Sequence, residues 1–240
     1  MGWREHFISD GTDLLKIDPQ VAPIQAYLGT LGMPGLTAYY GLLEIGKPKA
    51  GETVFVSAAS GAVGSIVCQI AKLKGCYVVG SAGSDEKVAW LTEEAGVDAA
   101  CNYKKVDNLI SEVGRKCPRG IDVYYENVGG GHLEAALEHM NKFGRIVMCG
   151  MIAVYNATKP VPGPSNLGHI ISKQLTMQGF IVSDHFDKLG QFYADMGKWI
   201  AEGKVKWQET IVDGLENAPR AFIGLFKGEN LGKMIVNVGD

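Results

Sequence analysis

The stretch that decides the fold covers residues 58–75 and reads AASGAVGSIVCQIAKLKG. The apolar segment TVFVSA (53–58) predicts a strand, and residues 62–74 have the pattern of a helix. At their junction the spacing Ala59-x-Gly61-x-x-Gly64 matches the glycine fingerprint of a dinucleotide-binding turn, with alanine in the first position. In such a turn the backbone approaches a pyrophosphate, and the N–H groups that open the helix face it. A turn of small residues that serves packing alone is the alternative.

Short apolar runs alternate with amphipathic segments from residue 53 onward. Beyond TVFVSA, the predicted strands are 76–82, 98–103, 121–128, 144–150 and 175–182. The predicted helices are 62–74, 85–95, 106–116, 131–141 and 166–173, followed by a long helix at about 186–202. This alternation predicts an α/β fold, a six-stranded doubly wound parallel sheet with ligands at the carboxyl ends of the strands.

The two ends of the chain have a different pattern. Residues 1–22 predict short strands around an SDG turn, and residues 207–240 predict a strand, a helix and a strand. We therefore expect the ends 1–22 and 207–240 to come together as part of a second lobe. The dinucleotide-binding domain is then expected over residues 23–206.

Composition narrows the class of protein. The chain has 240 residues and a net charge of −3, which argues against a nucleic-acid surface. No apolar run approaches the roughly 18 residues of a membrane span. The five cysteines show no CxxC spacing and no secretory signal is apparent, so reduced thiols are expected. These features predict a soluble, cytoplasmic protein.

The end of the second predicted strand indicates which dinucleotide is preferred. A site for NAD normally has an acidic residue there that binds the ribose hydroxyls, whereas this chain reads Ser81-Ala82-Gly83-Ser84. Lys87, in the first turn of the next helix, could reach a 2′-phosphate. Asp85 points the other way, but an acid in the first turn of a helix also has a capping explanation. The sequence therefore favours NADP, with a merely solvated Lys87 as the alternative.

Two other catalytic patterns are rejected. Tyr155 and Lys159 have the i, i+4 spacing of the proton-transfer dyad of short-chain dehydrogenases, but prolines 160, 162 and 164 make a helix through Lys159 improbable. A zinc site needs clustered cysteine, histidine and acidic ligands, and none is visible, so no metal is expected. The scattered histidines are expected on the surface or in loops: His6, His132, His139, His169 and His185.

Taken together, these residues resemble the zinc-free branch of the medium-chain dehydrogenase/reductases, above all its alkenal double-bond reductases and prostaglandin (leukotriene) reductases. The resemblance covers nearly the whole chain. It rests on LGMPGLTAYYGLLEIGKPKAGETVFVSAASGAVGS, GCYVVGSAGSDEKVAWL, YYENVGG, VMCGMIAVYN and GENLGKMIV. It implies a Rossmann domain that binds NADPH. It also implies that the two ends are the remaining strands of a GroES-like substrate lobe, so that the chain is a fragment or a natural short form.

The resemblance also implies where NADPH binds. The implied contacts are Gly61, Ala62, Val63 and Gly64 in the turn, Lys87 and Tyr103 around the adenosine phosphate, Asn127, the segment Cys149, Gly150, Met151, Ile152 to Tyr155, then Phe180, Ile181 and Val182 near the nicotinamide, and Asn230. Packing, capping or turn roles are the alternatives for these residues.

The reaction implied by the resemblance is NADPH-dependent reduction of the carbon–carbon double bond of α,β-unsaturated aldehydes and ketones. Tyr155 is the candidate catalytic residue because it follows the fifth strand, where the nicotinamide is expected, and packing is its alternative role. Two other functions stay open: an inactive NADPH-binding fragment and a quinone oxidoreductase. A homodimer through the sheet edge at 175–182 is also implied.

Overall fold

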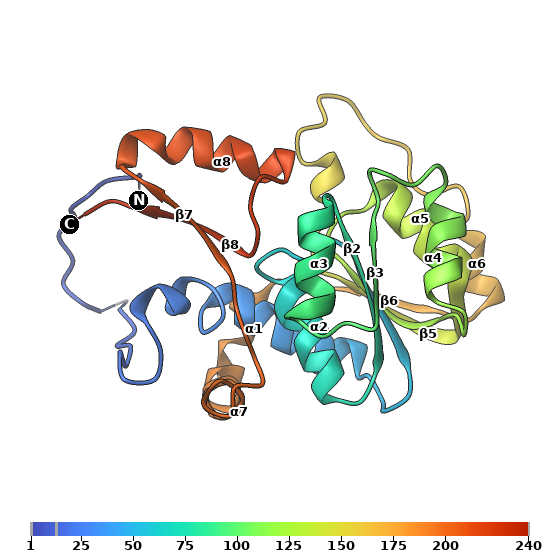
Figure 1. The fold of residues 1–240 in the computed structure, drawn as a ribbon, viewed down its shortest axis with the longest axis horizontal. Coiled ribbons are helices and arrows are strands. Elements are labelled where there is room, and N and C mark those ends of the chain that lie inside the picture. Colours follow the sequence, from blue (N-terminus) through green and yellow to red (C-terminus); the bar gives the residue numbers. More distant parts are fainter. Residues whose placement is uncertain (1, 13, 240) are drawn as a thin grey trace.

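A computed structural model describes residues 2–12 and 14–239. Its main sheet has six strands in the order β3-β2-β1-β4-β5-β6, and every neighbouring pair is parallel (Figure 1). The strands are β1 (Thr53–Val56), β2 (Tyr77–Ala82), β3 (Ala99–Asn102), β4 (Ile121–Glu126), β5 (Met140–Met148) and β6 (Thr176–Gly179). The strand order reverses between β1 and β4, so a crevice forms at the carboxyl ends of these two strands. The predicted doubly wound parallel sheet is confirmed.

Helices cover both faces of the sheet. On one face pack α1 (Met33–Tyr40), α2 (Gly64–Leu73), α3 (Asp85–Glu93) and α7 (Leu189–Ala201), and on the other α4 (Leu109–Lys116), α5 (Gly130–His139) and α6 (Gly168–Ser172). The middle strands are buried on both sides, and Val54, Phe55 and Val56 of β1 have no exposed surface. A continuous apolar run such as TVFV is what a strand covered on both faces requires.

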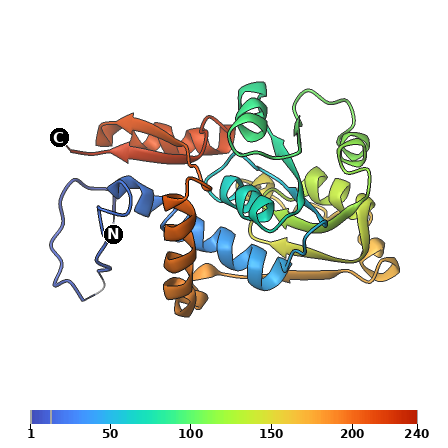
Figure 2. The ribbon, with the colours of Figure 1, turned by 60° about the horizontal axis from the view of Figure 1, so that its bottom comes forward.

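The C-terminal residues form a small separate unit beside the sheet (Figures 1 and 2). Strands β7 (Glu209–Asp213) and β8 (Lys233–Asn237) pair in parallel, and α8 (Ala218–Lys227) connects them. The predicted strand–helix–strand pattern is therefore present. The unit joins the main domain at the glycine turn, where the N–H of Gly232 donates to the carbonyl oxygen of Ser60 at 2.8 Å.

The first 22 residues differ from expectation, because the described part of this segment contains no strand. Between residues 2 and 20, the described side chains other than Ile17 are all exposed. A short strand is stable only when it pairs with a sheet and buries one face, and this segment does neither. The predicted strands in 1–22 are therefore wrong for the described residues.

Several helical segments were not predicted, or end elsewhere than predicted. Residues 24–46 form the 3₁₀ helix η1 (Ile24–Leu28), α1 and the π-helix η2 (Gly41–Gly46), none of which the alternating pattern indicated. Short 3₁₀ helices also occur at η3 (Ile152–Val154), η4 (Val182–Lys188) and η5 (Leu215–Asn217). The helix expected at 131–141 ends at His139, since Met140 already pairs with Ile121 as the start of β5. Among the described residues, no helix has the length and apolar character to cross a membrane.

Candidate dinucleotide-binding site

An open cavity of about 810 Å³ lies between the crevice of the sheet and the C-terminal unit. Nine of the residues predicted to bind the cofactor line it: Gly61, Ala62, Val63, Gly64, Lys87, Tyr103, Asn127, Ile152 and Asn230. They come from the ends of β1, β3 and β4 and from the loops around α3, η3 and α8. The structure therefore brings most of the predicted site together in one place.

The glycine turn presents backbone donors to this cavity. Ala58, at the end of β1, has a left-handed φ of 47°, and its carbonyl oxygen accepts the N–H of Gly61 at 3.0 Å. Among the described residues, no acceptor is found for the N–H groups of Val63 and Gly64 at the start of α2, whereas the bridge between Gly61 and Gly232 directs the N–H of Ala62 to the carbonyl oxygen of Gly232. Unpaired N–H groups at a helix N-terminus are suited to hold a phosphate.

Lys87 lies where the sequence predicts a 2′-phosphate contact. Ser84 caps α3 by accepting the backbone N–H of Lys87 at 3.3 Å, which fixes where the lysine side chain begins. The Lys87 ammonium lines the cavity and donates to the carbonyl oxygen of Gly228 at 2.6 Å. Asp85 is engaged elsewhere, by the side-chain amide of Asn102 at 2.7 Å and by Lys105. Asp85 does not line the cavity, which is consistent with the preference for NADP that the sequence predicts.

The charge of the cavity wall is strongly positive. Lys87, Lys104, Lys227 and Lys233 line it, and none of the lining residues is acidic. Partial burial, and secondarily the charge of Lys104, lowers the pKa of Lys87. Of these lysines only Lys87 was expected here, although Asn230, which lies between Lys227 and Lys233, was also predicted to contact the cofactor. This wall complements a ligand that carries several phosphate groups.

His132, at the start of α5, is buried in the wall of the cavity and not in a surface loop as expected. It is 5% exposed, its Nε2 lies 2.8 Å from the hydroxyl of Ser81, and its ring makes an edge contact with Tyr103 at 4.9 Å. The histidine therefore supports Tyr103 from behind. Burial lowers the pKa of His132 to about 4, so the ring is neutral near pH 7.

This buried histidine predicts a loss of stability in mild acid. The unfolded chain takes up a proton on His132 near pH 6.5, whereas the folded chain does so only near pH 4. The free energy of unfolding should therefore fall as the pH drops below 6.5, by about 2 kcal/mol at about pH 5. Urea unfolding at several pH values measures this loss. The variant His132→Gln should lose less stability over the same range, and an equal loss in both proteins would contradict the assignment.

Asn127 is held in place by a buried polar network at the end of β4. Its side-chain amide donates to the carbonyl oxygen of Ser57 at 2.7 Å, and its backbone N–H donates to the Ser57 hydroxyl at 2.9 Å. That hydroxyl donates to Glu126, whose side chain has no exposed surface and whose pKa is raised by burial. Sequence reasoning missed Ser57 and Glu126, although a polar residue at the end of a buried strand is a usable signal.

The segment after β5 lies beside the cavity, and of the predicted segment 149–155 only Ile152 and Ala153 line it. The hydroxyl oxygen of Tyr155 accepts the backbone N–H of Met151 at 3.2 Å and would meet a side chain added at Gly150. Tyr155 is 60% exposed. Cys149 is mostly buried, and this burial raises its pKa to about 11. Cofactor contacts at Cys149, Gly150, Met151 and Tyr155 stay predictions.

The segment after β6 lies outside the cavity wall. Phe180 packs against Tyr40, with ring centroids 5.6 Å apart, and Val182 is buried in the core. Ile181 is exposed. Contacts of Phe180, Ile181 and Val182 with a nicotinamide also stay predictions.

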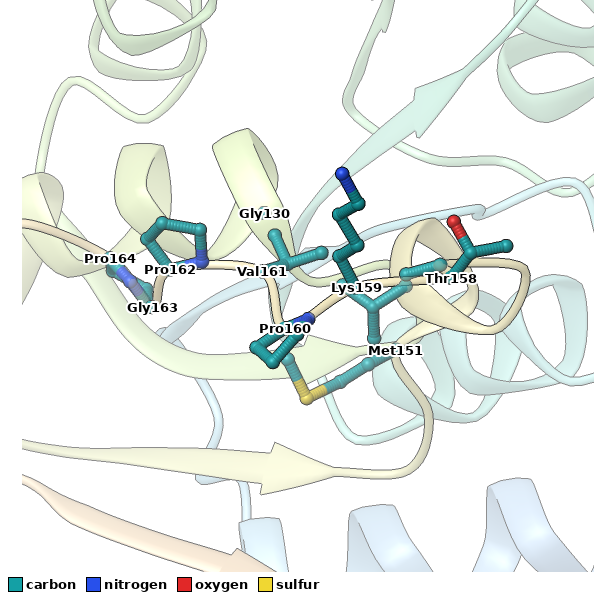
Figure 3. A pocket seen from close by; sticks show the side chains of 11 residues that line it. Gly130, Met151, Thr158, Lys159, Pro160, Val161, Pro162, Gly163 and Pro164 are labelled. Atoms are coloured by element: carbon teal, nitrogen blue, oxygen red, sulfur yellow. The ribbon is translucent and has the colours of Figure 1, made fainter.

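A second pocket of about 500 Å³ lies under the proline-rich loop that follows η3. Figure 3 shows loop residues 158–164 passing alongside Gly130 and Met151. The helix η3 ends at Val154, and residues 156–160 are not helical. Tyr155 and Lys159 are therefore not placed on one helical face, which agrees with rejection of the dyad.

The glycine turn, the unpaired N–H groups and the positive wall define a dinucleotide-binding α/β protein. Residues 62–201 match the family described as zinc-binding dehydrogenase. The chain is 55% identical over 240 residues to prostaglandin reductase 1 of Bos taurus, and the alignment covers 98% of this chain and 72% of the relative. It is 49% identical over 238 residues to the NADP⁺-dependent 2-alkenal reductase of Nicotiana tabacum, with 99% and 69% covered.

A solved structure has a closely similar fold. CurA from Vibrio vulnificus in complex with NADPH aligns with a TM-score of 0.92 at 45% identity, over 100% of this chain and 72% of that one. The chain therefore belongs to the zinc-binding dehydrogenase family, in its prostaglandin and alkenal reductase branch, and the resemblance seen in the sequence is confirmed. Despite the family name, no three His, Cys, Asp or Glu side chains gather as metal ligands within the described residues, which thus do not fit a zinc site.

Proposed function

We propose that this chain binds NADPH and reduces the carbon–carbon double bond of α,β-unsaturated aldehydes and ketones. The observation that carries the proposal is the cavity at the glycine turn, which combines free backbone N–H groups with four lysines and no acidic residue. The names of the relatives support the same cofactor and, for the 2-alkenal reductase, the same substrate class.

The residues of the cavity fit NADPH part by part. The N–H groups of Val63 and Gly64 would hold the pyrophosphate beside Gly61 and Ala62, and Lys87 with Tyr103 would hold the adenosine 2′-phosphate. Asn127, fixed by Ser57, would orient the ribose at the nicotinamide end. When bound, NADPH supplies a hydride for the β-carbon of the substrate.

Tyr155 would stabilise the negative charge that develops on the substrate carbonyl oxygen. Its hydroxyl oxygen already accepts the N–H of Met151, so its own proton is left to donate toward the substrate. The ribose hydroxyl of the cofactor is the competing donor. The α-carbon can take its proton from solvent, so no further acid is needed.

Tyr155→Phe tests this role. We expect kcat for an enone to fall about 100-fold while the affinity for NADPH stays within a factor of about three. Stopped-flow single turnovers separate the two effects. An unchanged kcat would transfer the role to the ribose hydroxyl, and an equal fall in NADPH affinity would make Tyr155 a binding residue.

The function itself is tested by mixing the chain with NADPH and 4-hydroxynonenal and following the nicotinamide absorbance. Oxidation of NADPH with formation of the saturated aldehyde supports the proposal. Binding of NADPH without turnover would instead indicate an NADPH-binding protein without activity. A strong preference for quinones would indicate a quinone oxidoreductase.

We propose further that two copies of the chain form a cytoplasmic homodimer through β6. This strand lies at the edge of the sheet, where its backbone groups are free to pair with a second copy. We also propose that residues 1–22 and 207–240 belong to a GroES-like substrate lobe. Size-exclusion chromatography with light scattering tests the dimer.

A further inference from the structure

Lys233 begins β8 and is fixed directly next to the glycine turn. The residue before it, Gly232, forms a parallel bridge with Gly61 and donates its N–H to Ser60. Gly232 has a φ of 68°, and an added Cβ atom would lie 1.8 Å from the carbonyl oxygen of Gln208. The backbone position of Lys233 is therefore tightly determined relative to the turn.

The side chain of Lys233 faces the start of α2. It lines the main cavity and also a small recess whose other lining residues include Ala62 and Ser65. Its stem lies close to Gly29, where an added Cβ atom would be 3.5 Å from the Cβ of Lys233. Lys233 thus lines the same cavity as Lys87 but also extends along the recess beside Ala62 and Ser65, which Lys87 does not line.

The Lys233 ammonium is partly buried without an ion pair among the described residues. Burial alone lowers its pKa. The strand neighbour Glu209 lies opposite Lys233 in the register and lines the same recess, but no ion pair joins these two side chains. A partly buried charge without a partner destabilises a fold. The position of the Lys233 ammonium beside free N–H groups therefore favours an anionic ligand.

We infer that Lys233 is the lysine that binds the pyrophosphate of the dinucleotide, a role distinct from that of Lys87. This inference rests on the proposed function, because it assumes that a dinucleotide occupies the cavity. A pyrophosphate on the N–H groups of residues 63 and 64 would be within reach of a flexible lysine stem that starts one residue after the bridge to Gly61. The C-terminal unit then takes part in cofactor binding directly.

The two lysines have different signatures in binding experiments. NADPH and NADH share the pyrophosphate but differ in the 2′-phosphate. Lys233→Met should therefore weaken both by the same factor, about tenfold or more, and leave their ratio unchanged. Lys87→Met should weaken NADPH only. Lys74→Met, at the exposed far end of the same helix α2, is the matched control and should match the wild type.

Titration of intrinsic fluorescence gives the affinities, and inorganic pyrophosphate as a competitor isolates the shared group. Equal affinities in Lys233→Met and the wild type would overturn the inference, as would a loss confined to NADPH. If the methionine variant does not fold, Lys233→Gln and Lys233→Arg take its place. Binding must then be weak in the first and restored in the second. A wild type that binds neither nucleotide would refute the proposed function, which is a different outcome.

Discussion

Replacing Lys87 by alanine should make the chain bind NADPH and NADH with nearly the same affinity. Ser84 caps the backbone N–H of Lys87, which positions this lysine in the first turn of α3, just after β2. Its ammonium group lines the cavity, and no carboxylate lines the cavity with it. A charge-assisted contact with a phosphate contributes about 1.5–3 kcal/mol, so NADPH should bind about 10- to 100-fold more weakly. Fluorescence titrations of both nucleotides measure the ratio.

The affinity for NADH provides an internal control in this experiment. Lys87→Ala also removes the contact with the carbonyl oxygen of Gly228, but unchanged NADH binding would show that the cavity is intact. Lys105→Ala serves as a second control, since Lys105 pairs with Asp85 on the exposed surface. Equal affinity of the wild type for the two nucleotides would refute the argument.

The sheet could be predicted from the sequence because each strand is a short apolar run between turn signals. TVFV and YVVGSA need burial on both faces, and only a parallel sheet covered by helices supplies it. The boundaries were less predictable. Met140 reads as the end of an amphipathic helix, yet it pairs with Ile121, because pairing with a neighbouring strand outweighs local helix preference.

Segments without an alternating pattern could not be predicted. The helices over residues 24–46 are rich in glycine and small apolar residues, so their burial against α2 and α7 decides their structure. His132 illustrates the same limit. Its position in the sequence does not indicate that it will meet Ser81, which belongs to strand β2 and forms its hydrogen bond.

The parts of the candidate site that belong to short sequence motifs could be predicted. The turn, Lys87 and Asn127 belong to motifs whose spacing carries the chemistry. Lys104, Lys227 and Lys233 carry no such pattern. The last two reach the cavity because Gly232 is bonded to Ser60, a contact between segments far apart in the sequence.

Gly64→Ala should destabilise the fold strongly. A Cβ atom at this position would lie 2.4 Å from the carbonyl oxygen of Ala58 and 2.8 Å from the Cα of Ala59. Both are backbone atoms of the turn, which cannot move without shifting α2 away from β1. We expect the free energy of unfolding to fall by at least about 2 kcal/mol, measured by urea denaturation. Unchanged stability would show that α2 packs less closely than described.

Gly61→Ala is the same substitution three residues earlier, but it should lower nucleotide affinity and leave stability nearly unchanged. The nearest atom to an added Cβ atom there is the carbonyl oxygen of Ala58 at 3.3 Å, so the fold accommodates the methyl group with a small adjustment. The methyl group would instead reduce the space through which a pyrophosphate approaches the backbone. Stability should therefore stay close to that of the wild type while NADPH and NADH affinities both fall. If Gly61→Ala bound both nucleotides normally, Gly61 would serve packing alone.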